Sequence, residues 1–316
     1  MTNPVTRVGE VLAPVVTPFD DEWRPAARAF VDQCRWLLER NVGLAVFGTN
    51  SEANSLALSE KRWLLEKLVE AGLPASRMMP GTGCCAYPET IELCRAALDL
   101  GITRVLMLPP FFYKHVPDDG LFEAYARIID GVGDDRLRIY LYHIPPIAQV
   151  PISEALIERL LAHFPDTIAG AKDSSGDWGN TQMMLERFAP HGFEVFPGSE
   201  SFLLRTMRAG GAGCISATAN VNPAAIAALA ADWQTLDARS GVGEGTAADD
   251  AQLGLDRVRA AFQRQPMIQA MKAELARFSG RGGWRRVRPP LMPLADAEIA
   301  ELERELDAIG FAIEGL

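Results

Sequence analysis

Short apolar runs alternate with segments of helical periodicity along most of the chain. Eight of these runs are rich in apolar residues and too short for helices, so they predict β-strands. They cover residues 11–16, 44–49, 77–82, 104–109, 138–143, 167–172, 193–198 and 213–218. After each run, apolar residues recur every three or four positions, which predicts an amphipathic helix. These helices are expected over 30–40, 59–72, 88–101, 120–132, 153–164, 180–189, 201–211 and 223–233, with Ser59, Ser153 and Asn180 capping three of them.

This alternation predicts an α/β fold of the (β/α)8 TIM-barrel type. Strands that are apolar throughout and are joined through helices indicate a parallel sheet covered on both faces. Eight strand–helix units in about 230 residues suit a closed barrel better than an open sheet. We therefore expect a barrel over residues 1–232 and a C-terminal helical extension packed on it over 233–316. The extension has helical patterns at 244–263, 266–279 and 296–310, and residues 240–250 (SGVGEGTAADD) are the most loop-like segment.

Composition narrows the classes of partner. The 316 residues are 48% hydrophobic and 23% charged, and their net charge of −10 argues against a nucleic acid or an anionic membrane as partner. No apolar run is long enough to span a membrane, and MTNPVTRVGE at the N-terminus lacks the pattern of a signal peptide. The five cysteines have neither disulfide nor zinc spacing, and the four histidines have no metal-ligand spacing. We expect a soluble cytoplasmic protein with reduced thiols and no metal.

One lysine stands where a barrel would carry its chemistry. Active sites of TIM barrels lie at the carboxyl ends of the strands, and Lys172 follows the apolar run 168–171. The chain has only five lysines beside 26 arginines. A lysine just past a strand can simply extend into solvent. A lysine shielded from water can instead attack a carbonyl and form a Schiff base. The residues alone leave both interpretations open.

Other strand ends offer possible partners for Lys172. Tyr142 ends the fifth predicted strand, where an aromatic is usually core filler but can also relay protons to a neighbouring amine. Thr49 and Asn50 follow the second strand. Their simpler interpretation is a helix cap, and the alternative is a cradle for the carboxylate of a 2-oxo acid.

Seven motifs, in this order, resemble the dihydrodipicolinate synthase / N-acetylneuraminate lyase family of pyruvate-type class I aldolases. The resemblance covers roughly residues 8–310. The motifs are APVVTPF (13–19), GTNSEANSLALSE (48–60), PPFFYKHVPDDGLF (109–122), YHIPP (142–146), GAKDSSGD (170–177), GAGCISATANVNP (211–223) and VRPPLMPL (287–294).

The resemblance implies a role for each matching residue. Lys172 matches the lysine that forms the Schiff base, and Tyr142 matches the tyrosine that relays protons. Thr49 matches the hydroxyl residue of that relay, and Asn50 its neighbour in the carboxylate-binding loop. Such an enzyme needs no metal or organic cofactor, because the protonated imine is the electron sink. The family also implies a homotetramer built as a dimer of dimers.

Further substrate contacts are expected on the last strands of the barrel. Gly198 matches a glycine that leaves room for the substrate, and Ile215 matches a position whose backbone carbonyl lines the site. Ser174, two residues after the lysine, resembles branches of the family that act on 2-keto-3-deoxy sugar acids and hydroxy-oxo acids. Ser174, Ser199 and Glu200 are candidate hydrogen-bond partners for substrate hydroxyl groups.

The chain also departs from the family pattern. The usual G-[ST]-T-G-E loop has Asn50 in place of its second threonine, which looks more like the 4-hydroxy-2-oxoglutarate aldolase branch than the synthase. The tyrosine that reaches into a neighbouring subunit's site aligns with Phe112, and Tyr113 could replace it only if the loop shifts. The synthase also has an arginine shortly after its strand-5 tyrosine, whereas residues 146–148 carry no cation.

We therefore predict a Schiff-base lyase with a small 2-oxo acid as substrate. The expected reaction is reversible aldol cleavage of a 4-hydroxy-2-oxo acid or a 2-keto-3-deoxy sugar acid, with pyruvate as product. A dehydratase that uses the same lysine imine is the first alternative, and dihydrodipicolinate synthase is the second. A non-catalytic 2-oxo-acid-binding protein is the alternative from a different class, and it rests on Phe112 alone.

Overall fold

The computed structural model describes residues 9–238 and 245–316. The loop-like segment 240–250 and the helix expected from residue 244 therefore begin outside the described residues. The strands are β1 (Glu10–Ala13), β2 (Val42–Leu44), β3 (Arg104–Met107), β4 (Arg138–His143), β5 (Ile168–Asp173), β6 (Glu194–Pro197) and β7 (Gly213–Ile215). The helices are α1 (Ala27–Glu39), α2 (Leu58–Glu70), α3 (Tyr87–Asp99), α4 (Asp118–Val132), α5 (Pro145–Ala148), α6 (Glu154–His163), α7 (Trp178–Arg187), α8 (Leu203–Arg208), α9 (Pro223–Ala238), α10 (Ala247–Gln263), α11 (Met267–Ser279) and α12 (Asp296–Ala308).

All pairings between these strands are parallel. β1 lies between β2 and β7, and a second sheet has the order β3-β4-β5-β6. The strand predicted over 44–49 is displaced, because regular pairing ends at Leu44 and Phe47 has a left-handed backbone with a φ of 62°. Such a φ interrupts extended structure and turns the chain toward the end of the barrel.

Residues 78–82 fill the gap between the two sheets. The strand predicted over 77–82 is present only as isolated parallel bridges on either side. The Met79 amide donates to the Leu44 carbonyl over 2.8 Å, and the Leu106 amide donates to the Pro80 carbonyl over 2.9 Å. The segment therefore pairs with β2 on one side and with β3 on the other.

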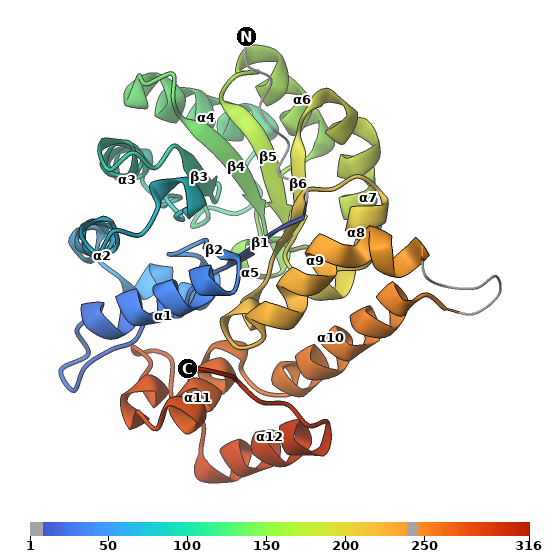
Figure 1. Cartoon of the computed structure of the whole chain (residues 1–316). Coiled ribbons are helices and arrows are strands. Elements are labelled where there is room, and N and C mark those ends of the chain that lie inside the picture. The colour runs from blue at the N-terminus through green and yellow to red at the C-terminus, as the bar shows by residue number, and fades with distance from the viewer. Residues whose placement is uncertain (1–8, 239–244) are drawn as a thin grey trace.

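A hydrogen bond between β6 and the approach to β7 joins the remaining edges. The Ala212 amide donates to the Val195 carbonyl over 3.1 Å, and the Glu10 amide donates to the Ala212 carbonyl over 2.9 Å. Figure 1 shows the strands grouped at the centre, with helices around them. The fold is a (β/α)8 TIM barrel with a C-terminal helical region.

Alternate strand residues supply two separate apolar clusters. On β4, Ile139 and Leu141 belong to the large cluster between strands and helices, whereas Tyr140 and Tyr142 belong to a smaller cluster. Because successive side chains of a strand point to opposite faces, the smaller cluster fills the barrel interior. Its largely aliphatic and aromatic members include Leu12, Ala45, Met79, Leu106, Phe196 and Ile215.

One of the three expected helix caps is present. The cap expected at Ser59 is wrong, because α2 begins at Leu58 and its N-cap residue is Ala57. The Ser153 hydroxyl accepts a hydrogen bond from the Leu156 amide over 3.0 Å at the start of α6. The expectation for Asn180 is wrong, because α7 begins two residues earlier and the Asp177 carboxylate accepts from the Gly179 amide over 2.8 Å. Aspartate is about as good a cap as asparagine, so the helix can begin at the earlier residue.

The C-terminal helices pack on the barrel through a buried ion pair. Figure 1 shows α10, α11 and α12, coloured orange to red, gathered together. Lys272 of α11 lies 2.6 Å from the Glu52 carboxylate, and both side chains are fully buried. The other Glu52 oxygen accepts from the Arg288 amide over 2.8 Å. Glu52 directly follows the turn that contains Thr49, so its ion pair with Lys272 holds α11 against that turn.

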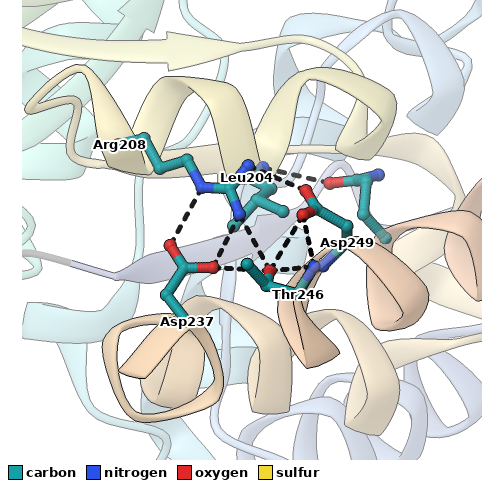
Figure 2. Close-up of polar contacts among 6 residues, drawn as sticks. Leu204, Arg208, Asp237, Thr246 and Asp249 are labelled. Carbon is teal, nitrogen blue, oxygen red and sulfur yellow. Dashed lines mark hydrogen bonds and ion pairs between the residues drawn. The ribbon is translucent and has the colours of Figure 1, made fainter. Parts of the chain in front are cut away.

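Helix α10 is attached to α8 and α9 by a second polar network, shown in Figure 2. The Arg208 guanidinium donates to Asp237 over 2.6 and 2.9 Å and to Asp249 over 2.8 Å. These contacts hold the pKa of both carboxyl groups below their usual range. The Thr246 hydroxyl caps α10 by accepting from the Asp249 amide over 3.1 Å. Three consecutive helices are thereby fixed relative to one another.

The described residues contain no disulfide bond. All five cysteines are free thiols, and Cys85 alone is exposed. Residues 9–238 and 245–316 hold no group of three or more His, Cys, Asp and Glu side chains that could bind a metal ion. In the same ranges, no helix combines the length and the apolar character needed to cross a membrane.

Candidate active site

Lys172 and Tyr142 lie side by side on adjacent strands. Lys172 of β5 is paired in register with Tyr142 of β4. The Lys172 Nζ donates to the Tyr142 hydroxyl over 3.2 Å and lies 4.3 Å from the centre of the tyrosine ring. Lys172 is only 2% exposed. No carboxylate of the described chain lies within ion-pair distance of Nζ. The hydrogen-bond partner of the amine among the described residues is the Tyr142 hydroxyl group.

A second hydroxyl group extends this contact. The Thr49 Oγ1 lies 3.1 Å from the Tyr142 hydroxyl oxygen. Thr49 begins a short 3-10 turn, Thr49–Ser51, in the loop after β2. The Ser51 hydroxyl accepts from the Gly48 amide over 3.1 Å, and its carbonyl accepts from the Thr17 hydroxyl over 2.7 Å. The turn is therefore held in place, and the chain of polar atoms runs from Lys172 through Tyr142 to Thr49.

The amides of this turn offer donors to an anion. The Ser51 and Glu52 amides bond back to the carbonyls of Gly48 and Thr49. The amides of Thr49 and Asn50 have no partner among the described residues. Initial amides of a helical turn lack internal acceptors, and they are suited to hold a carboxylate.

These groups open onto a cavity of about 470 Å³. Seven of the residues singled out from the sequence line it: Thr49, Asn50, Tyr142, Lys172, Ser174, Gly198 and Ser199. Residues that the sequence did not single out also contribute: Ile144, Ile147, Asp173, Gly176, Ser201, Phe202, Ala217, Arg259, Gln263 and Met267. The volume lies within the range of small-molecule sites.

Gly198 makes room for a protein side chain. A Cβ atom added at Gly198 would lie 2.0 Å from the Ser174 Oγ and 3.0 Å from the Ser174 Cα. The Gly198 amide also donates to the Asp173 carbonyl over 2.6 Å. Glycine at this position therefore lets Ser174 pack against the end of β6, and this positions Ser174 at the cavity wall.

Glu200 and Ile215 lie behind the cavity wall. Glu200 is 1% exposed, and its carboxylate accepts from the hydroxyl groups of Ser216 and Thr218 and from Arg259 over 2.6 Å. A carboxylate with these partners is satisfied within the protein. Ile215 is fully buried in β7, with its side chain in the barrel interior.

Phe112 and Tyr113 lie away from the cavity of their own chain. They are 72% and 73% exposed, and their rings form an edge-to-face pair with centres 5.4 Å apart. Both lie in the loop between β3 and α4. The Lys114 ammonium donates to the Ala148 carbonyl over 2.7 Å and so ties this loop to α5. A relay role for either aromatic across a subunit boundary stays a prediction.

His143 is buried and forms a hydrogen bond to the protein backbone. Its Nδ1 accepts a hydrogen bond from the Ile152 amide over 3.0 Å, which requires that this nitrogen carry no proton. Burial lowers the pKa of His143 below its usual value of 6.5, although nearby Asp173 opposes the shift. The Asp173 carboxylate in turn accepts from the Thr181 hydroxyl over 2.6 Å. His143 therefore supports the loop after α5 as a neutral ring.

Comparison with known proteins identifies the family of the chain. The sequence profile of the Dihydrodipicolinate synthetase family matches residues 7–309. The chain belongs to this family. An uncharacterized DapA-like lyase from Chloroflexus aurantiacus is 32% identical, with 98% of each chain covered. As a member of the family, the chain is a lyase of the class I aldolase type.

Solved structures of the family have the same fold. Dihydrodipicolinate synthase from Agrobacterium tumefaciens is 27% identical and has a TM-score of 0.84, with 95% of this chain and 99% of that chain covered. A variant of Sulfolobus solfataricus 2-keto-3-deoxygluconate aldolase is 20% identical, with a TM-score of 0.82 over 95% of this chain and 96% of that chain. The second likeness is informative for the fold alone.

Proposed function

We propose that this lyase cleaves a 4-hydroxy-2-oxo acid or a 2-keto-3-deoxy sugar acid through a Schiff base on Lys172, with pyruvate as product. The observation that carries the proposal is the continuous polar chain from Lys172 through Tyr142 to Thr49, with contacts of 3.2 and 3.1 Å, at the wall of the cavity. A buried amine without a carboxylate partner suits attack on a carbonyl.

Imine formation, C–C bond cleavage and product release can each be assigned to residues of the site. The Lys172 amine adds to the substrate C2 carbonyl, and loss of water gives a protonated imine. Removal of the proton from the C4 hydroxyl breaks the C3–C4 bond, and the bonding electrons pass into the imine to give an enamine and an aldehyde. Protonation of C3 and hydrolysis release pyruvate. Tyr142 is the acid and base for these transfers, since its hydroxyl contacts Nζ.

Substrate orientation comes from the turn after β2. The unpartnered amides of Thr49 and Asn50 hold the substrate carboxylate, which places C2 next to Lys172. Thr49 Oγ1 orients the Tyr142 hydroxyl and exchanges protons with it. Ser174 and Ser199 face the same cavity and bind substrate hydroxyl groups. No cofactor takes part in these steps, because the imine withdraws the electrons.

Trapping with borohydride tests the proposal directly. Incubation with pyruvate and borohydride should add one reduced pyruvyl group to the wild-type chain, read as intact mass, and none to Lys172→Ala. Peptide mapping should locate the adduct on Lys172. Absence of an adduct on the folded wild-type protein would contradict the proposal. A panel of hydroxy-oxo acids, with pyruvate release coupled to lactate dehydrogenase, then separates aldol cleavage from dehydration.

Synthase activity is the second candidate, since the 27% identical Agrobacterium structure bears that name. The cavity wall at α5 argues against it. Residues 146–148 carry no cation, and Ile147 is the α5 residue that lines the cavity. A carboxylate on the second substrate would find no charged partner at this point. Condensation of pyruvate with aspartate semialdehyde at a rate above aldol cleavage would favour the synthase.

A further inference from the structure

Arg259 of helix α10, in the C-terminal region, places a positive charge at the cavity wall. Arg259 and Gln263 are four residues apart on α10, so they lie on the same face of the helix, and both line the cavity. Arg259 is 11% exposed as a side chain. Apart from Lys172, it is the only Lys or Arg among the lining residues of this cavity in the described chain.

One end of the Arg259 guanidinium is anchored. Its Nη1 donates to the Glu200 carboxylate over 2.6 Å and to the Ser216 hydroxyl over 3.1 Å. Glu200 also accepts from the hydroxyl groups of Ser216 and Thr218, so its carboxylate is fully occupied. The buried acid therefore fixes the orientation of the guanidinium, and no free carboxylate oxygen remains to meet the substrate.

The other end of the guanidinium is unoccupied. Arginine has five N–H donors, and the Nε and Nη2 of Arg259 have no partner among the described residues. Both nitrogens are accessible to solvent, because the buried side-chain atoms without a partner in the described residues do not include them. An anchored guanidinium with free, accessible donors at a cavity wall is suited to bind a carboxylate in a defined orientation.

The rest of α10 is also held in place. The Gln252 side chain donates to the Glu200 carbonyl over 2.9 Å and accepts from the Leu204 amide over 3.0 Å. The Arg208 network of Figure 2 fixes the start of the helix. Arg259 is therefore preorganised before substrate arrives, which reduces the entropy lost on binding.

We propose that Arg259 binds a second carboxylate at the far end of the substrate and so selects 4-hydroxy-2-oxo diacids over sugar acids whose far end is uncharged. This inference rests on the proposed Schiff-base reaction at Lys172. A single carboxylate fits better than a phosphate, since the one guanidinium there is already paired with Glu200 and the wall also includes the Asp173 carboxylate.

The test compares two substrates that differ only at the far end. 4-Hydroxy-2-oxoglutarate has a terminal carboxylate, and 4-hydroxy-2-oxopentanoate has a methyl group in its place. Pyruvate release is measured with both for the wild type, Arg259→Gln and Arg259→Lys. Arg257→Gln is the matched control, because Arg257 lies on the same helix with its side chain exposed. Thermal melting checks that each variant is folded.

We expect the wild type to prefer the diacid. Arg259→Gln should lose about 30- to 150-fold in kcat/KM for the diacid, mostly through KM, and less than about threefold for the methyl substrate. Arg259→Lys should recover only part of this loss, and Arg257→Gln should match the wild type. Because Arg259→Gln leaves Glu200 without its cation, Arg259→Gln/Glu200→Gln repeats the measurement with both charges removed, and the same selective loss is expected.

Two results would overturn the inference. One is a wild type that cleaves both substrates equally well, and the other is an equal loss on both substrates in the Arg259 variants, which would indicate a purely structural role. Either result leaves the Schiff base intact if wild-type protein still forms the pyruvyl adduct. Failure of that adduct would instead refute the proposed function itself, so the two failures are distinguishable.

Discussion

The Tyr142 hydroxyl lies 3.2 Å from the Lys172 Nζ, and the two residues are register partners on β4 and β5. Adjacent parallel strands bring residues at equal height together, so this contact follows from the pairing of the two strands. The same tyrosine oxygen lies 3.1 Å from Thr49. Tyr142 therefore connects the amine to the turn after β2, and it is the residue whose loss should affect every proton transfer.

Replacement of Tyr142 by phenylalanine should lower kcat for aldol cleavage by about 100-fold or more, the usual contribution of a positioned acid–base group. Adduct formation with pyruvate should become slower but still occur, because Lys172 is unchanged. Steady-state kinetics and the time course of borohydride trapping measure the two effects. Tyr125→Phe is the matched control, since the Tyr125 hydroxyl is buried in α4 and has no partner in residues 9–238 and 245–316. Unchanged turnover in Tyr142→Phe would exclude the relay.

Sequence patterns were sufficient to place this part of the site. Lys172 and Tyr142 each end an apolar run, and a barrel places the ends of all its strands on one face. The hydrophobic pattern located most strands within a few residues, because burial on both faces demands continuous apolar residues. The hydrophobic pattern misplaced the strand predicted over 44–49. The left-handed backbone of Phe47 interrupts the extended conformation there, although the residues around it are apolar as in a strand.

The pattern could not place residues that act from outside the strands. Arg259 looks like an ordinary cation on an amphipathic helix, and only the packing of α10 brings it to the cavity. Glu200 was expected to meet substrate, because its place after β6 gave no sign that Arg259, Ser216 and Thr218 would occupy it. Contacts between residues far apart in sequence depend on tertiary packing, which periodicity does not encode.

The buried pair of Lys272 and Glu52 predicts a strong effect on stability. Lys272→Met should lower the free energy of unfolding by about 3 kcal/mol, because it leaves the Glu52 carboxylate buried without its cation. Lys272→Met/Glu52→Gln should recover much of that loss. Urea unfolding measures both. Lys67→Met is the control, since the exposed Lys67–Glu70 pair on α2 should contribute about 0.5 kcal/mol or less. Equal losses in the single and double variants would contradict a charge-based explanation.

The exposed side chains of Phe112 and Tyr113 predict that copies of this chain associate. Phe112 and Tyr113 are large apolar side chains that lie open to solvent, as expected if a second copy of the chain covers them. We expect a homotetramer, measured by light scattering after size exclusion, and smaller species for Phe112→Ser/Tyr113→Ser. Leu253→Ser, at another exposed apolar side chain, should leave the mass unchanged. A wild-type chain that stays monomeric at all concentrations would refute this prediction.

Glu274 on α11 predicts the pH dependence of stability. Burial raises its pKa to about 7, with Glu303 and Asp307 of α12 adding to the shift and Arg277 opposing it. The folded chain therefore keeps this proton up to about pH 7, whereas the unfolded chain releases it near the ordinary value of 4.5. Since the folded state binds more protons in this interval, the contribution of Glu274 to stability falls as pH rises from about 4.5 to 7.

Replacement of Glu274 by glutamine removes this titration and keeps the shape of the side chain. The gain in unfolding free energy of Glu274→Gln over the wild type should be about 2 kcal/mol larger at pH 8 than at pH 4.5. Urea unfolding at both pH values measures the difference. Glu301→Gln, at an exposed position on α12, is the control for the loss of a carboxylate and should show no comparable difference between the two pH values. If the gain of Glu274→Gln were the same at both pH values, Glu274 would titrate normally in the folded chain, and its burial would be relieved by water or by movement of Arg277.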